Sequence, residues 1–158
     1  MKSTWNIVEK SNGELLVTVD GAAWKQAQDK AFKNYLIAAE KHHTPSQYMV
    51  GLCYEFGYGT SINETQAVIW YGEATKVDHL ESELRLGLCY KEGKGIEQSY
   101  PLAATWLLKA AQKGNLEAKR EAALCYEELN QPVAAATLFL AAAEDGDLLS
   151  IERIAEYY

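Results

Sequence analysis

Three cysteines, three histidines and many carboxylates are the side chains of this chain that could catalyse a reaction or bind a metal. Cys53, Cys89 and Cys125 lie 36 residues apart, not at the Cys-x-x-Cys spacing of zinc and dithiol sites. Equivalent positions of stacked helices lie ~8–10 Å apart, too far for a disulfide, so we expect buried free thiols. His43 and His79 are expected at helix ends, where the helix dipole favours positive charge.

Two glycine-rich stretches could hold a phosphate in another setting. Residues 57–59 and 93–95 each follow a predicted helix, and neither continues into Gly-Lys-Ser/Thr, the phosphate-loop signature. The carboxylates, such as Glu127 and Glu128, fall on predicted helices. No nucleophile, base and orienting group come together. The sequence predicts no enzyme, no cofactor and no metal site.

Composition narrows the classes of partner and compartment. The net charge of -7 and the pI of about 5.0 disfavour binding to nucleic acid, whose phosphates require a basic surface. No run of 18 apolar residues is present, so we expect no membrane span. The start of the chain lacks the apolar core of a secretory signal. Together with an odd number of cysteines, this predicts a cytoplasmic protein.

An internal repeat organises the elements that must position these side chains. The tripeptide Leu-Cys-Tyr begins at Leu52, Leu88 and Leu124. Residues 67–74 align with residues 103–110, and the third unit aligns once a gap of four residues is placed in its loop, which is shorter by that number. Each unit holds two runs with apolar residues at helical spacing. Because one helix pair cannot bury its own apolar face, the units should stack into a solenoid.

Proline, capping side chains and glycine set the helix boundaries. Asn63, Ser99 and Asp147 are suited to begin helices, and Gly57 and Gly93 to end them. The predicted helices cover residues 21–42, 46–56, 64–77, 81–92, 100–113, 116–129, 132–145 and 148–158.

Small and aromatic side chains at equivalent positions predict how these helices pack. Gly51 and Gly87 would let a neighbouring helix approach closely, which outweighs the ~1 kcal/mol that a helical glycine costs. Trp70 and Trp106 would fill the space between paired helices.

The pattern Leu/Val-Gly-x-x-Tyr-x-x-Gly-x-Gly, followed by Ala-x-x-Trp-Tyr-x-x-Ala-Ala-x-x-Gly, resembles the Sel-one-like repeat, a relative of the tetratricopeptide repeat. The resemblance covers residues 31–158, and the third unit departs from it by losing both loop glycines and the tryptophan. It implies an all-α fold, a right-handed α-α superhelix of antiparallel helix pairs. We assign residues 21–158 to this solenoid, with units at about 46–79, 82–115 and 118–147 and partial units at both ends.

Residues 1–20 do not match the repeat. Residues 5–9 and 15–19 have the pattern of two short strands, joined by a turn at Ser11-Asn12-Gly13. An isolated hairpin is marginal in water, so we expect this β-hairpin to cap the first end of the solenoid.

The same region resembles the beginning of bacterial trigger factor, a ribosome-associated chaperone. Trp5, residues 14–19 and residues 29–33 carry this resemblance, which covers residues 4–35. The ribosome-docking signature Gly-Phe-Arg-Lys of that family is missing. The resemblance therefore implies a bacterial origin and a protein-folding context, and the family's ribosome contact carries over to no residue of this sequence.

In the tetratricopeptide relatives, the first helix of each unit lines a groove that holds a partner. By this resemblance the groove positions lie six before, two before and one after the repeat tyrosine. They are Tyr48, Leu52, Glu55, Leu84, Leu88, Lys91, Arg120, Leu124 and Glu127. An apolar centre with both charges at its edges suits an extended peptide or a helix. The alternative is that the three leucines are simply buried between helices.

We therefore predict a protein-protein interaction scaffold, or adaptor, that binds a peptide or partner helix in this groove. The trigger-factor-like start offers the alternative of a chaperone-like accessory that handles nascent or unfolded chains. Because the last residues fall inside a would-be fourth unit, we also expect that bare solenoid ends could form a homo-oligomer.

Overall fold

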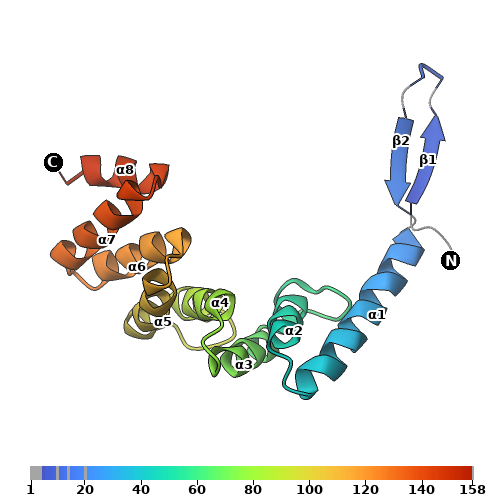
Figure 1. Ribbon diagram of the computed structural model, residues 1–158, viewed down its shortest axis with the longest axis horizontal. Coiled ribbons are helices and arrows are strands. Elements are labelled where there is room, and N and C mark those ends of the chain that lie inside the picture. Colours follow the sequence, from blue (N-terminus) through green and yellow to red (C-terminus); the bar gives the residue numbers. More distant parts are fainter. Residues whose placement is uncertain (1–4, 10, 14, 20, 158) are drawn as a thin grey trace.

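The computed structural model describes residues 5–9, 11–13, 15–19 and 21–157. Its helices are α1 (Gly21–Glu40), α2 (Thr44–Phe56), α3 (Glu64–Thr75), α4 (Leu80–Glu92), α5 (Tyr100–Gln112), α6 (Leu116–Glu128), α7 (Pro132–Glu144) and α8 (Leu148–Ala155). Each helix packs on the next one along the chain. Figure 1 shows a curved row, with α4 and α6 on the inside of the bend and α3 and α5 on the outside. The predicted all-α helix pairs are confirmed.

Two strands precede α1. β1 (Trp5–Glu9) and β2 (Leu15–Val19) pair antiparallel, with Ile7 opposite Val17. Figure 1 shows this pair beyond the first turn of α1, away from the bend. Residues 1–4, 10, 14 and 20 of the predicted segment lie outside the described residues. A capping role for the hairpin stays a prediction, as does the handedness of the superhelix.

Polar side chains cap the starts of several helices. Side-chain oxygens accept the backbone N–H three residues further on at Asn63, Ser99, Asn115 and Asp147. At α4 the cap is His79, whose Nδ1 accepts the N–H of Ser82 at 3.3 Å. The prediction that His43 and His79 serve the C-terminal ends of helices is wrong, because both stand at N-cap positions. At His79 that position needs an acceptor nitrogen, not a positive charge.

Glycines end the first helices of the two units that have long loops. Gly57 has a φ of 76° and Gly93 a φ of 68°, a left-handed conformation that glycine adopts without a steric penalty. In the third unit, which lacks these glycines, only residues 129–131 separate α6 from α7. The third unit therefore has a tighter turn than the first two.

Helix pairs close on large side chains that face small ones. A Cβ added at Gly87 would lie 2.7 Å from Cγ of Leu107, and one at Gly51 would overlap the ring of Tyr71. Tyr71, Leu107 and Phe139 are the large buried side chains of the second helices. The two tryptophans expected in this role are only half-buried, and Trp106 packs on the cluster that joins α3 and α4. In the first two units the fully buried residue is therefore the one that follows the predicted tryptophan.

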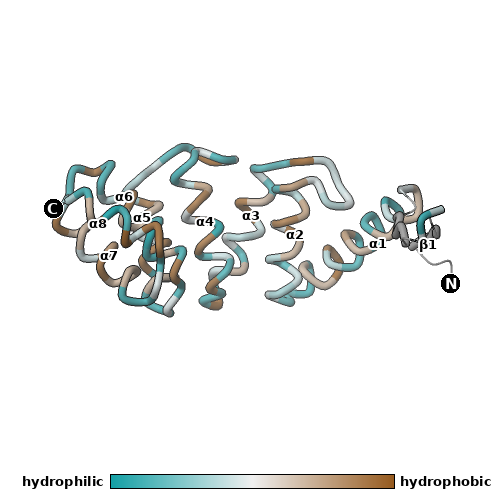
Figure 2. The backbone as a smooth tube through the Cα atoms, turned by 90° about the horizontal axis from the view of Figure 1, so that it is seen from above, coloured by the Kyte–Doolittle hydropathy of each residue, from teal (hydrophilic) through white to brown (hydrophobic). Residues whose placement is uncertain are grey.

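Buried residues lie between successive helices instead of at one centre. One cluster joins α4, α5 and α6, a second joins α3 and α4, and a third joins α6 and α7. Figure 2 shows hydrophobic segments along the whole length of the helical part. Cys53, Cys89 and Cys125 are buried and free, as predicted. The first helices are thus held in place by neighbours on both sides.

Candidate functional site

The first helices of the units, α2, α4, α6 and α8, form what we call the inner face. In Figure 1, α4 and α6 line the inside of the bend. All nine predicted groove residues lie on α2, α4 or α6. Each helix carries three of them at the same repeat positions, so the fold brings the predicted set onto one face.

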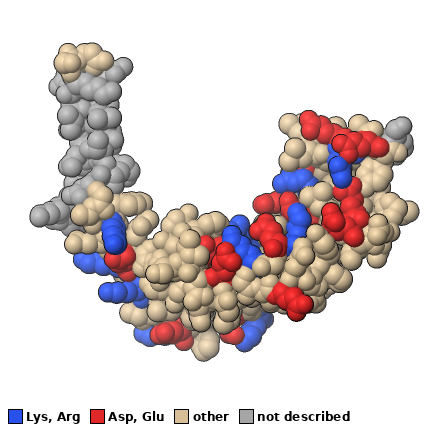
Figure 3. Space-filling view, turned by 180° about the vertical axis from the view of Figure 1, so that it is seen from behind, with Lys and Arg blue, Asp and Glu red and all other residues tan. Residues whose placement is uncertain are grey.

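Ion pairs join each first helix to the next one, and we call them the ion-pair row. They are Glu55–Arg85 at 2.7 Å, Lys91–Glu121 at 2.5 Å and Glu127–Arg153 at 2.7 Å. The first two pairs are 30 residues apart and the third 26, because the third unit has the shorter loop. From one pair to the next, the first member alternates between acidic and basic, and the second member alternates in the opposite order. Figure 3 shows acidic and basic side chains next to one another along the bend.

Glu55 is the most buried carboxylate of this row, with a side chain that is 6% exposed. It accepts hydrogen bonds from Arg85 Nε at 3.2 Å and Nη2 at 2.7 Å, from Lys94 Nζ at 3.3 Å and from Tyr71 Oη. Burial on its own would raise the pKa of Glu55, but the hydrogen bonds from Tyr71 and Arg85 and the nearby cations outweigh it and lower the pKa. Glu55 is thus an ionised group that ties two units together.

A second set of pairs links first helices to the ends of the helices that follow them. Glu83, fully buried, accepts two hydrogen bonds of 2.8 Å from Lys113. At the equivalent positions of the next unit, Lys119 pairs with Asp145, so the charges are exchanged again. Both members of each of these pairs lie in one unit, so the pairs hold the two helices of that unit together. In the ion-pair row the members lie in successive units, so exchanging two units would place like charges together, and that row favours one order of stacking.

Several predicted groove residues serve the fold more than the surface. Leu84 is 8% exposed and Glu55 7%, which leaves a partner little of either to touch. The ring of Tyr48 packs 5.2 Å from that of His79, and Arg120 holds the N-cap Asp147 at 2.6 Å. The leucines of the repeat are half-buried, each against a core cluster: Leu52, Leu88 and Leu124. The leucines are thus neither fully buried nor fully exposed, and their part in a groove stays a prediction.

The second members of the ion-pair row were not among the predicted groove residues. Arg85 and Glu121 are 36 residues apart and opposite in charge. The change from basic Arg85 to acidic Glu121 is the reverse of the change from acidic Glu55 to basic Lys91. A comparison of charge between equivalent repeat positions was the signal that could have found them.

An aromatic surface with two cations lies where α2 meets α4. Phe56 is 42% exposed and stacks on Tyr58, with 5.7 Å between ring centroids. Arg85 Cζ lies 5.0 Å and Lys94 Nζ 5.4 Å from the centroid of Phe56, within the range of cation–π attraction. The ion pairs with Glu55 thus hold both cations beside an exposed ring.

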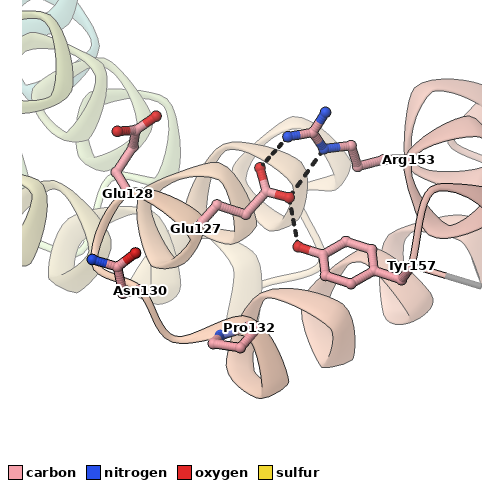
Figure 4. Close-up of a pocket in the computed structure, with 6 residues that line it drawn as sticks. All are labelled: Glu127, Glu128, Asn130, Pro132, Arg153 and Tyr157. Atoms are coloured by element: carbon pink, nitrogen blue, oxygen red, sulfur yellow. Dashed lines mark hydrogen bonds and ion pairs between the residues drawn. The ribbon is translucent and has the colours of Figure 1, made fainter.

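A pocket of about 760 Å³ opens where α6 meets α8. It is lined by Glu127, Glu128, Asn130, Pro132, Arg153 and Tyr157. Figure 4 shows Arg153 and Tyr157 converging on Glu127, which accepts hydrogen bonds from Arg153 Nε at 3.0 Å and Tyr157 Oη at 2.5 Å. The hydrogen bond from Arg153 is the main reason that the pKa of Glu127 is lowered. The pocket is polar and carries more acidic than basic groups.

The described part of the chain holds neither a cluster of metal ligands nor a helix suited to span a membrane. No three side chains of His, Cys, Asp or Glu come together there as ligands for a metal ion. None of the described helices has both the length and the apolar character to cross a bilayer.

Comparison with known proteins gives matches over most of the helical part. The family model of the Sel1 repeat matches residues 25–43, 44–79 and 80–115. The crystal structure of a Sel1 repeat protein from Oxalobacter formigenes is similar, with a TM-score of 0.75 and 32% identity over 81% of this chain and 54% of that one. A protective antigen of uropathogenic Escherichia coli with an SLR fold has a TM-score of 0.69 and 31% identity over 73% of this chain and 26% of the antigen. The chain thus spans about half the length of the first relative and less of the second. No curated protein matches it significantly.

These matches do not support the resemblance to trigger factor. The first repeat match covers residues 25–43, which include residues 29–33 that had suggested the chaperone. Helix α1 packs on α2 as the preceding helix of the same solenoid. The apolar and aromatic residues of this stretch are therefore explained by the repeat.

Proposed function

The chain belongs to the Sel1 repeat family, and from this premise we propose that it is a scaffold that binds a peptide or a helix of another protein along its inner face. Repeats of this family usually mediate protein-protein interactions. The chaperone alternative rested on the resemblance to trigger factor, which the comparisons do not support.

The observation that carries this proposal is the continuity of the inner face. The same three repeat positions recur on α2, α4 and α6. The ion-pair row fixes the spacing from each of these helices to the next. Held apart in this way, the half-buried leucines and the charged side chains repeat at a regular interval. A regular, concave and preformed surface suits a long partner segment, because little conformational entropy is lost in the scaffold on binding.

Photo-crosslinking tests this proposal. A photoreactive amino acid is placed at Leu88 on α4, half-buried on the inner face, and in a matched protein at Ile69 on α3, which is 51% exposed. Both are irradiated in bacterial lysate and the adducts are identified by mass spectrometry. We expect a defined adduct from position 88 and none of the same identity from position 69. Equal adducts from both positions would show that partner contact is not specific to the inner face.

A second copy of the chain is a further candidate partner, through α8. Leu148 is 72% exposed, Leu149 58% and Ile151 48%, and among the described helices only α7 packs extensively on α8. Apolar side chains gathered on one short helix favour association. Sedimentation velocity at rising concentration tests this association, and compares the parent chain with the double variant Leu148→Glu and Ile151→Glu. If the parent chain stays monomeric at high concentration, this candidate is rejected.

A further inference from the structure

The residue that follows each first member of the ion-pair row changes along the inner face. At these equivalent positions stand Phe56, Glu92 and Glu128. Phe56 is exposed beside Tyr58, whereas Glu92 and Glu128 are exposed carboxylates. The same place in three successive units thus offers an aromatic ring, then an acid, then an acid.

The balance of charge also becomes more acidic from the place where α2 meets α4 (the first place) to the place where α6 meets α8 (the last place). Where α2 meets α4, Arg85 and Lys94 surround the single carboxylate of Glu55. Where α6 meets α8, Arg153 is the cation for Glu127 and Glu156, and Glu128 lines the same pocket. The first place has one more cation than carboxylates, and the last has two more carboxylates than cations.

The cations at the first place retain capacity for another acceptor. Arg85 directs Nε and Nη2 to Glu55, and a guanidinium has five N–H donors in all. The side chains of Arg85 and Lys94 are 23% and 29% exposed. A carboxylate of a partner can therefore reach them, and an apolar side chain beside that carboxylate can cover Phe56 and Tyr58.

The pocket at the last place favours a basic side chain of a partner instead of an acidic one. Glu127 is already held by Arg153 and Tyr157, whereas Glu128 is exposed at the wall of the pocket. A lysine or arginine of a partner would bring a positive charge into a region with an excess of acids. Its aliphatic stem would lie against Pro132.

We propose that the inner face binds an extended peptide that is acidic and aromatic or aliphatic at one end and basic at the other, in one orientation. The inference rests on the proposed function and specifies the partner's chemistry. The two places are two unit steps apart, roughly 20 Å if each step is one helix-packing distance. An extended chain covers that distance in roughly six residues. The acidic and basic groups of the partner should be separated by about that number.

Synthetic peptides of fixed design test this inference. Each fluorescein-labelled peptide carries Glu-Phe-Glu and Lys-Lys blocks, in both orders, joined by serine and threonine spacers of about two, six or ten residues. Matched peptides carry two acidic or two basic blocks. Binding to the full chain is measured by fluorescence anisotropy. We expect the peptide with the spacer of about six residues to bind at least about tenfold more tightly than the peptides with like charges.

Two substitutions locate the two ends, and neither replaces a member of the ion-pair row. Phe56→Glu installs the residue that Glu92 and Glu128 already provide at equivalent positions, so the fold should accept it. Glu128→Lys reverses the charge of the exposed carboxylate at the wall of the pocket. Each should weaken the best peptide about tenfold, whereas Ile69→Glu on α3 should leave its affinity unchanged. Circular dichroism verifies that each variant is folded.

The outcomes separate this inference from the proposed function. Three results would each overturn the inference that the partner is a peptide with one acidic and one basic end. They are binding without preference for charge pattern or spacing, no binding of any peptide, and an affinity that Phe56→Glu and Glu128→Lys leave unchanged. If crosslinks still form from position 88 and not from position 69, the scaffold stands without it. If neither experiment shows use of the inner face, both are rejected.

Discussion

Arg85 on α4 donates two hydrogen bonds, of 2.7 and 3.2 Å, to the buried carboxylate of Glu55 on α2. The two residues belong to consecutive repeat units, so this ion pair joins the first helices of those units directly. Glu55 keeps its charge because Tyr71, Arg85 and Lys94 together surround it. The stacking of these two units therefore depends on a charged group that has lost most of its contact with water.

Loss of Arg85 should destabilise the solenoid. Arg85→Leu leaves Glu55 buried with a single weaker cation, which we expect to lower the free energy of unfolding by ~3 kcal/mol. Urea unfolding followed by circular dichroism measures it. The control is Lys76→Leu, which breaks an exposed pair with Glu73 and should change stability by less than about 0.5 kcal/mol. Equal effects of both substitutions would contradict a stabilising role for the buried pair.

Stability should fall in acid, and Glu55 and Glu127 should contribute to the loss. The pKa of each is lower in the folded chain than its ordinary value, which is about 4.3 in an unfolded chain. The stabilising contribution is therefore complete above about pH 5 and disappears as pH falls through the folded pKa values. Thermal unfolding between pH 7 and pH 3 measures it. Glu55→Gln should flatten this dependence, and an unchanged slope would show that Glu55 is not responsible.

Gly87 and Gly72 are helical glycines with opposite surroundings. A Cβ at Gly87 would meet Leu107, including its backbone nitrogen at 3.3 Å, whereas one at Gly72 would meet nothing within 4 Å. We expect Gly87→Ala to destabilise by ~1–3 kcal/mol through overpacking. Gly72→Ala should stabilise by up to ~1 kcal/mol through helix propensity. Chemical denaturation of both variants measures the contrast, and a stabilising Gly87→Ala would refute the close approach of α4 and α5.

The thiols of the repeat should be inert in the folded chain. Burial raises the pKa of Cys89 to about 12 and that of Cys125 to about 11, and it also raises the pKa of Cys53. Since the thiolate is the reactive form, Ellman's reagent at pH 8 should react slowly with the native chain and rapidly with all three cysteines in denaturant. Fast reaction of a native thiol would contradict the packing around that residue.

Much of the fold could be predicted from the sequence because its signals are local and repeated. Capping residues such as Asn63 and Ser99, and glycines such as Gly57, mark helix boundaries through the backbone geometry that they favour. The 36-residue recurrence then requires that the same packing be used in each unit. Predicted and observed helix ends differ by three residues at most.

The site was less predictable because its contacts depend on neighbours from another unit. Tyr48 and Leu84 were predicted to line a groove by position alone, yet Leu84 is buried in the cluster of α4, α5 and α6. His79 was misassigned because its helix begins one residue earlier than predicted, at Leu80. Phe56 carried no repeat signal, since other units have glutamate at that position. Differences between units, and not their common pattern, mark the candidate binding residues.

Hydrogen–deuterium exchange is the measurement that tests use of the inner face most directly. The full chain is compared alone and with the partner identified by crosslinking, and exchange is followed in peptides from each helix. We predict slower exchange on binding in residues 80–92 of α4 and 116–128 of α6, with little change in residues 64–75 of α3. Protection confined to α3, α5 and α7 on a partner that is bound would show that the outer helices, and not the inner face, hold the partner.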